Sequence, residues 1–189
     1  SFLYPRRGIG VLTDRICETV SRNTDIHFGT VLRRLDARRR VATLSGGMTL
    51  SYEALVSTVP LDRLARTLVD PPARVARAAR KLRVRTLSYL DVALKVPAGT
   101  PYHWTYVPDR AVPFYRVGAY SNFSADLVPP GCGSLYVELT ARRPGPAGKT
   151  VARVLPWLKA MGIIRSQRDV RFVRLRRIPH AYVIYDHSW

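Results

Sequence analysis

The spacing of apolar residues divides the chain into helical and extended segments. Apolar side chains recur at helical intervals near the start of the chain, at Ile9, Leu12, Ile16 and Val20. This spacing predicts an amphipathic helix from residue 10 to about residue 21. The same reasoning predicts a short helix over 61–68, a helix that follows Pro71-Pro72, and a helix over 150–161.

Extended apolar patterns occupy most of the remaining chain. In the first half they predict strands over 30–35, 40–44, 48–50 and 54–59. The second half is denser in strands, which we expect over 85–96, 103–107, 112–120, 134–140, 170–177 and 181–185. Helices and strands in this mixture predict an α+β fold with no internal repeat.

The composition is that of a globular protein. Of 189 residues, 47% are hydrophobic and 10% aromatic, which excludes a chain that is disordered throughout. No apolar run approaches the roughly 20 residues of a transmembrane helix. The two cysteines form no disulfide framework, so a cytoplasmic setting is the default. The chain begins without Met and ends on an apolar run, from which we expect a segment of a longer protein.

The charge is strongly basic and admits several interpretations. Lys and Arg number 31 against 13 acidic residues, a formal net charge of +18. Such a chain attracts phosphates, nucleic acid or anionic lipid, and one helix face collects Arg74, Arg77, Arg80 and Lys81. An Arg-rich nucleic-acid-binding module is therefore an alternative, although nucleic acid is a less favoured partner. A GC-rich coding sequence also explains the excess of arginine over lysine, and an inactive remnant is a further alternative.

Familiar catalytic motifs are absent from the sequence. It contains no Gly-rich dinucleotide fingerprint, no ATPase-type phosphate loop, no HExxH and no nucleophile elbow. The four histidines and two cysteines are scattered, so we expect no metal site.

One segment concentrates aromatic, Arg and Asn side chains on neighbouring predicted strands. On strand 112–120 the period of two places Phe114, Arg116, Gly118 and Tyr120 on one face. If the hairpin pairs Tyr106 with Arg116, an aromatic wall lies beside a guanidinium. That arrangement suits a planar or sugar-like ligand that carries a phosphate or carboxylate. The alternative is a half-buried sheet with aromatic residues in the core and a solvated arginine.

The order of motifs resembles FAD-dependent enzymes of the flavin amine oxidase superfamily. The stretch FLYPRRGIGVL at 2–12 is similar to their Phe-x-x-Pro-x-x-Gly-Gly segment. The stretch from Val31 to Pro60 resembles their succession of two strands, a Gly turn and Tyr-x-x-Leu-Val-Ser-Thr. Within the superfamily, the eukaryotic-type UDP-galactopyranose mutases are most similar, because WTYVP at 104–108, PFYR at 113–116 and YSN at 120–122 follow their order. Protoporphyrinogen-oxidase-like proteins are more distant relatives.

The resemblance implies FAD as cofactor and a small-molecule substrate, such as a nucleotide sugar. It implies that Val31 holds the adenine through its backbone and that Gly8 and Gly10 pass close to the flavin. Tyr106 and Arg116 match positions that contact the substrate pyrophosphate. Further substrate contacts are implied at Tyr182 and Asn122.

The same resemblance assigns a function to each part of the chain. Residues 1–69 would form part of an α/β FAD-binding domain, 70–178 a substrate domain with a mixed sheet, and 179–189 a return to the first domain. The implied function is a segment of an FAD-dependent oxidoreductase, and a mutase-like sugar isomerase is the alternative. Phe123 replaces a family tyrosine, which removes one hydroxyl contact to phosphate. Missing parts of the same polypeptide would then complete the flavin site.

Overall fold

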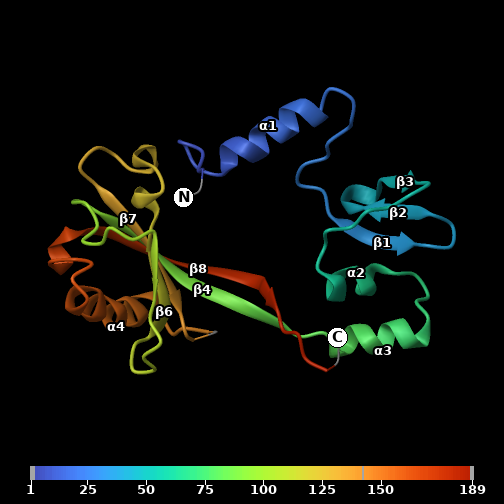
Figure 1. Ribbon diagram of the computed structural model, residues 1–189. Coiled ribbons are helices and arrows are strands. Elements are labelled where there is room, and N and C mark those ends of the chain that lie inside the picture. Colours follow the sequence, from blue (N-terminus) through green and yellow to red (C-terminus); the bar gives the residue numbers. More distant parts are fainter. Residues whose placement is uncertain (1–2, 142, 188–189) are drawn as a thin grey trace. The chain divides into compact units, whose positions relative to one another are not determined.

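The computed structural model describes residues 3–141 and 143–187, which fall into two units. The larger unit comprises Ser1–Arg22 and Thr86–Ala181, and the smaller unit comprises Asn23–Arg85 and Tyr182–Trp189. Figure 1 shows the order of the elements along the chain. The described elements combine helices with two sheets, which confirms the predicted α+β fold. The functions assigned to 1–69, 70–178 and 179–189 stay predictions.

The smaller unit contains a three-stranded antiparallel sheet and two helices. Its strands β1 (Leu32–Asp36), β2 (Val41–Leu44) and β3 (Thr49–Ser51) pair in sequence order. The helices α2 (Leu61–Thr67) and α3 (Ala73–Lys81) each begin directly after a proline. Proline favours this position because its fixed φ suits the start of a helix and its missing N–H is not needed there.

The strand predicted over 54–59 is wrong. These residues form a loop in which Leu55, Val56 and Val59 are exposed, Val56 to 93%. A strand requires a neighbour whose backbone groups are free to pair. Among the described residues none pairs with this run, because the small sheet ends at β3.

The larger unit contains a five-stranded sheet in the order β5-β6-β7-β4-β8. Its strands are β4 (Val84–Leu94), β5 (Trp104–Tyr106), β6 (Phe114–Ala119), β7 (Gly133–Leu139) and β8 (Val170–Val183). We expected a mixed sheet, whereas the β5–β6, β6–β7 and β4–β7 ladders are all antiparallel. The two strands predicted at 170–177 and 181–185 are one strand, since an edge strand tolerates Pro179.

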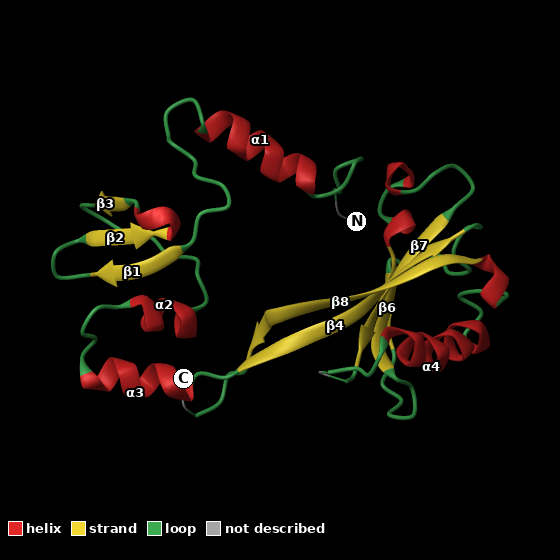
Figure 2. Cartoon of the chain, turned by 180° about the vertical axis from the view of Figure 1, so that it is seen from behind, coloured by secondary structure: helices red, strands yellow, loops and turns green. Residues whose placement is uncertain are grey.

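One face of this sheet packs beneath helix α4 (Ala147–Ala160) and forms the core, as Figure 2 shows. Alternate residues of the three central strands supply it, including Leu90, Val92, Leu135, Val137 and Val117. Helix α4 contributes Val154, Leu155 and Leu158 to the same cluster. Each such side chain stabilises the fold by about 1.5–3 kcal/mol when fully buried. The side chains on the opposite face of these strands do not contribute to this core and are available for other contacts.

A β-bulge corrects one predicted face. The pairing of β6 with β7 shifts between Phe114 and Arg116, so Phe114 pairs with Leu139 and Arg116 pairs with Glu138. A bulge inserts an extra residue and reverses the alternation on its two sides. Phe114 consequently lies fully buried in the core instead of beside Arg116.

The first helix is confirmed as α1 (Gly10–Val20), one residue shorter than predicted. Its apolar stripe packs less than expected, because none of its residues is buried. Ile9, Leu12, Ile16 and Val20 are all exposed.

Candidate functional site

The face of the five-stranded sheet opposite to α4 carries polar and aromatic side chains. We call it the polar face, and its members alternate with the core residues on the same strands. They include Tyr89 and Asp91 of β4, Trp104 and Tyr106 of β5, Arg116 of β6, and Ser134, Tyr136 and Glu138 of β7.

Arg116 lies at the centre of a hydrogen-bonded group on the polar face. The ladders place it directly opposite Tyr106 on one side and Glu138 on the other. Its Nη2 donates to Glu138 Oε1, and its Nη1 donates to the Tyr106 hydroxyl at 3.2 Å. The predicted proximity of Tyr106 and Arg116 is therefore confirmed. Glu138 was not predicted to take part.

Two aromatic rings flank the guanidinium. Arg116 Cζ lies 5.6 Å from the centroid of Tyr106 and 6.0 Å from that of Tyr136. At these distances the ring faces attract the cation. Gly118 makes room for Tyr136, because a Cβ at residue 118 would overlap the atoms of this ring. The guanidinium of Arg116 thus lies near two aromatic rings.

The Arg116 side chain is a permanent cation whose charge is locally balanced. Partial burial alone would lower its pKa, but the hydrogen bonds that Arg116 donates to Glu138 and Tyr106 outweigh burial and raise the pKa. Glu138 is only 5% exposed. Among the described residues Arg116 Nε and Glu138 Oε2 are buried without a hydrogen-bond partner. The group can therefore offer directed hydrogen bonds to a ligand, rather than an unbalanced charge.

Asn122 and Phe123 shape the loop beside the polar face. Asn122 Nδ2 donates to the carbonyls of Thr100 and Tyr102, at 2.8 Å each. These bonds fix the loop and engage both amide hydrogens, while a substrate contact at Asn122 stays a prediction. The ring of Phe123 lies 5.2 Å from that of Tyr4 and 6.1 Å from that of Trp104. The ring of Phe123 therefore packs against other aromatic rings, and this packing requires no hydroxyl group.

Of the two glycines predicted near the flavin, Gly8 lies in the turn before α1 and Gly10 is the first residue of that helix. Gly8 has φ +96° and its N–H donates to the Pro5 carbonyl at 3.0 Å. Ser124 Oγ donates to the Arg6 carbonyl and holds this turn to the larger unit. A Cβ at Gly10 would meet no atom within 4 Å. Gly10 thus leaves the backbone open on that side.

Val31 and Tyr182 belong to the smaller unit, whereas Arg116 belongs to the larger unit. The Val31 N–H donates to Ser45 Oγ at 3.1 Å, and its carbonyl accepts from the Ser45 N–H at 2.8 Å. Tyr182 is exposed near the end of β8. The predicted roles of both residues in adenine and substrate binding stay predictions.

A pocket of about 390 Å³ opens on the larger unit over β4, β7 and β8. We call it the β8 pocket, and its polar and aromatic lining includes Asp91, Tyr120, Ser134, Phe172, Arg174 and Arg176. Arg176 Nε donates to Asp91 Oδ2 at 3.1 Å, and the Tyr120 hydroxyl is hydrogen-bonded to Asp91. Burial, followed by the charge of Asp91, raises the pKa of Tyr120, which therefore remains a donor at neutral pH.

Sequence reasoning missed the acidic members of both groups. The alternation in β7 of Ser134, Tyr136 and Glu138 with leucine and valine is visible in the sequence and places these three on one face. Asp91 is the single acidic residue within the apolar strand β4. A charged residue in an apolar strand indicates a polar partner nearby. The identity of that partner depends on the register of the neighbouring strands, which the sequence does not show.

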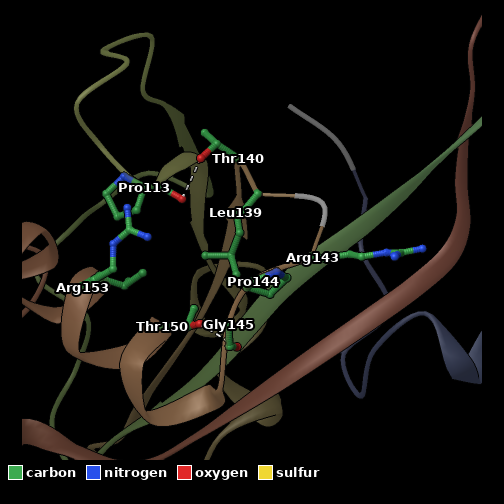
Figure 3. Close-up of a pocket in the computed structure, with 10 residues that line it drawn as sticks. Pro113, Leu139, Thr140, Arg143, Pro144, Gly145, Thr150 and Arg153 are labelled. Carbon is green, nitrogen blue, oxygen red and sulfur yellow. Dashed lines mark hydrogen bonds between the residues drawn. The ribbon is translucent and has the colours of Figure 1, made fainter.

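A smaller pocket of about 130 Å³ lies at the start of α4, on the helical side of the sheet (Figure 3). Thr140 donates to the Pro113 carbonyl at 3.2 Å, and Thr150 donates to the Gly145 carbonyl at 3.2 Å. The side chain of Arg143 extends away from the other lining residues. The hydroxyls in this pocket are thus committed to backbone groups, and it lacks the convergent polar groups of the polar face.

The chain is similar to a known family and to several solved structures. Residues 1–166 match the family model described as flavin containing amine oxidoreductase. The structure of a reduced UDP-galactopyranose mutase is similar with a TM-score of 0.82 and 25% identity, over 95% of this chain and 41% of that chain. A protein described as a protoporphyrinogen oxidase from Exiguobacterium is similar with a TM-score of 0.68 and 15% identity, over 94% and 40% of the two chains.

Putrescine oxidase bound to putrescine is a further match, with a TM-score of 0.68 and 13% identity, over 89% of this chain and 38% of that chain. The chain therefore spans about two fifths of the length of each of these structures. None of the helices in the described part of the chain combines the length and apolar character needed to cross a membrane.

Proposed function

The chain belongs to the flavin containing amine oxidoreductase family, and we propose that it supplies the substrate-binding sheet of a flavin-dependent oxidoreductase. The observation that carries this proposal is the Arg116 group on the polar face. A guanidinium cation and two tyrosine rings, one of which offers its hydroxyl, lie together on the side of the sheet opposite to α4. Such convergence of a few polar groups on an aromatic surface is typical of a small-molecule site.

The Arg116 group binds and orients an anionic group of the substrate. A phosphate or carboxylate oxygen accepts hydrogen bonds from the guanidinium and from the Tyr106 hydroxyl. Glu138 holds the guanidinium in place before the ligand arrives, so binding orders fewer side chains. The rings of Tyr106 and Tyr136 lie close to the guanidinium and attract the cation. These residues position the substrate and need not move a proton.

FAD is the cofactor of the family, and when bound it supplies the redox chemistry. The residues of this chain fit part of an FAD site. The backbone turns sharply at Gly8, where φ is +96° and a Cβ would meet Leu127 Cδ2 at 3.2 Å. At Gly10 a Cβ would meet no atom within 4 Å, so the backbone there is open to a flat ring system. In our proposal the Val31 carbonyl accepts from the adenine with its second lone pair, beside the bond from Ser45. The sequence holds no dinucleotide fingerprint, so other residues of the protein bind the pyrophosphate of FAD.

A mutase-like sugar isomerase is the second candidate function. In its favour, both the TM-score and the identity are higher for UDP-galactopyranose mutase than for the two oxidases described above. In this variant of the proposal Tyr106 and Arg116 bind the pyrophosphate of a nucleotide sugar. Tyr182 and Asn122 are further substrate contacts in that case.

Calorimetric titration of the 189-residue chain with UDP tests the proposal. The variant Arg116→Gln removes the cation, and Arg110→Gln removes an equal charge from the exposed turn before β6. A hydrogen bond to a charged group contributes about 1.5–3 kcal/mol, so we expect Arg116→Gln to weaken UDP binding by about tenfold or more. Arg110→Gln should leave the Kd within about twofold of wild type, as for a screened surface charge.

Equal losses in the two variants would refute the proposed site, because they would show that UDP responds only to the net charge of the chain. Absence of UDP binding combined with binding of a carboxylate ligand that depends on Arg116 would favour the oxidoreductase over the mutase-like function. Circular dichroism of each variant verifies that the fold is retained.

A further inference from the structure

We propose that helix α3 carries a binding surface for the phosphate backbone of double-stranded DNA. We call it the α3 surface and define it by four exposed cations, Arg74, Arg77, Arg80 and Lys81. It lies in the smaller unit, whereas the Arg116 group lies in the larger unit, so the inference does not depend on the proposed function. Within the smaller unit, α3 lies beyond α2, on the side away from the three-stranded sheet (Figure 1).

The packing of α3 leaves its cations on the outside of the smaller unit. The helix contacts α2, and its apolar residues Val75 and Ala79 are half-buried. Arg74, Arg77 and Lys81 share another side of the helix, because they are spaced by three and four positions. Ala78 beside them is also exposed and has only a methyl group. A phosphate can therefore approach the charged groups closely.

The charges of the α3 surface lack a counter-charge from the protein. The stretch 71–85 contains six Lys and Arg residues and no acidic residue. In the part of the chain that the structure describes, none of the four cations forms an ion pair, while the neighbouring Arg83 pairs with Asp186 at 3.4 Å. Like charges at helical spacing repel one another. A polyanion bound to the surface relieves this repulsion.

The dipole of α3 explains only part of this charge pattern. Cations are favourable in the last turn of a helix, where Arg80 and Lys81 lie. Arg74 lies instead in the first turn, where the dipole favours anions, and no acidic residue is present there. The electrostatics of the helix itself therefore oppose a cation at this position. An anion outside the helix gives Arg74 a favourable partner.

The chemistry of the α3 surface favours a DNA duplex over a membrane or a single strand. A helix that binds a membrane inserts an apolar face, whereas the apolar side of α3 packs within its own unit. Single strands stack on aromatic rings, and the stretch 71–85 contains no aromatic residue. The guanidinium groups of three arginines suit phosphate, because each can donate two parallel hydrogen bonds. Along about 13 Å, the length of α3, a duplex carries about eight phosphate charges.

Fluorescence anisotropy of a labelled DNA duplex, titrated with the 189-residue chain at several salt concentrations, tests this inference. Each neutralised phosphate contributes about 0.9 to the slope of the logarithm of the binding constant against the logarithm of salt concentration, so we expect a slope of about −3 to −4. The double variant Arg74→Gln/Arg77→Gln should make the slope less steep by about 2 and weaken binding about tenfold or more at about 0.1 M salt.

The matched control is the double variant Arg110→Gln/Arg168→Gln, which removes the same charge from exposed positions of the larger unit. It should leave the Kd for the duplex within about twofold of wild type, as for screened surface charges. Circular dichroism verifies that both double variants retain the fold. Equal losses in the two double variants would overturn the inference, because they would show that the duplex responds only to the net charge of the chain.

Two further ligands separate the duplex from other polyanions. A single strand of the same sequence should bind more weakly than the duplex, since its charge density is lower and the α3 surface offers no ring for stacking. Vesicles of phosphatidylserine and phosphatidylcholine should retain less of the chain than the duplex does. Tighter binding of the single strand, preference for the vesicles, or absence of binding to the duplex at about 0.05 M salt would each overturn the inference.

Discussion

The buried pair of Arg116 and Glu138 gives the sharpest prediction of stability. Replacing Glu138 by alanine leaves the Arg116 guanidinium, whose side chain is 25% exposed, without its carboxylate partner. Removal of one partner from a buried pair costs about 3–5 kcal/mol. Because Arg116 retains some contact with water and its bond to Tyr106, we expect the low end, about 3 kcal/mol.

The surface pair of Arg15 and Glu18 is a matched control within the same unit. Its atoms lie 2.7 Å apart, but the side chains are 75% and 60% exposed. Exposed pairs contribute only about 0–1 kcal/mol, so Glu18→Ala should have little effect. For a unit of this size, a loss of about 3 kcal/mol lowers the Tm by about 10 °C.

Thermal and urea unfolding followed by circular dichroism measure both variants. A double-mutant cycle with Arg116→Met isolates the coupling between the two residues, which we expect to exceed about 1.5 kcal/mol. The double variant should recover part of the loss, since apolar replacements remove both charges together. If Glu138→Ala destabilises the chain no more than Glu18→Ala does, the pair is not buried as described and the reasoning is refuted.

Three further predictions concern the packing of the polar face, the start of α1 and the titration of three partly buried tyrosines. Gly118→Ala should destabilise the larger unit by about 1–3 kcal/mol in urea unfolding, because the new Cβ overlaps the ring of Tyr136; an unchanged midpoint would contradict that contact. Gly10→Ala, where a Cβ meets nothing, should change the stability by less than about 1 kcal/mol. In a spectrophotometric titration at alkaline pH, Tyr89, Tyr120 and Tyr136 should ionise later than exposed tyrosines, since burial is the largest cause and raises the pKa of each. The stability from these phenols is complete below the unfolded tyrosine pKa of about 10 and is lost as the pH rises above it, because the unfolded chain then releases protons first; one uniform ionisation step in the folded chain would refute it.

The sequence predicted individual helices and strands better than it predicted which strands pair with one another. Helix α3 follows from the prolines before it, and β7 follows from alternation. The run at 54–59 has the same apolar character as a buried strand but finds no neighbour to pair with. Local pattern does not contain that information, because pairing joins residues far apart in the chain.

The same limit applies to the candidate site. The approach of Tyr106 to Arg116 was predictable because one hairpin carries both residues. Glu138 and Asp91 acquire their partners through the register of non-adjacent strands, which no local pattern specifies. The bulge that sends Phe114 to the core depends likewise on the pairing with β7. Resemblance to a family supplied a prediction that the local pattern could not, namely which residues would contact a flavin and an anionic substrate.

The most direct test of the polar face as a ligand site is an amide NMR titration of the 189-residue chain with UDP. We predict that shifts concentrate at Tyr106, Arg116, Gly118 and Tyr136, and that the amides of α4 on the opposite side of the sheet stay in place. Shifts centred instead on the arginines of α3 would show that UDP binds a basic surface, and would contradict the account.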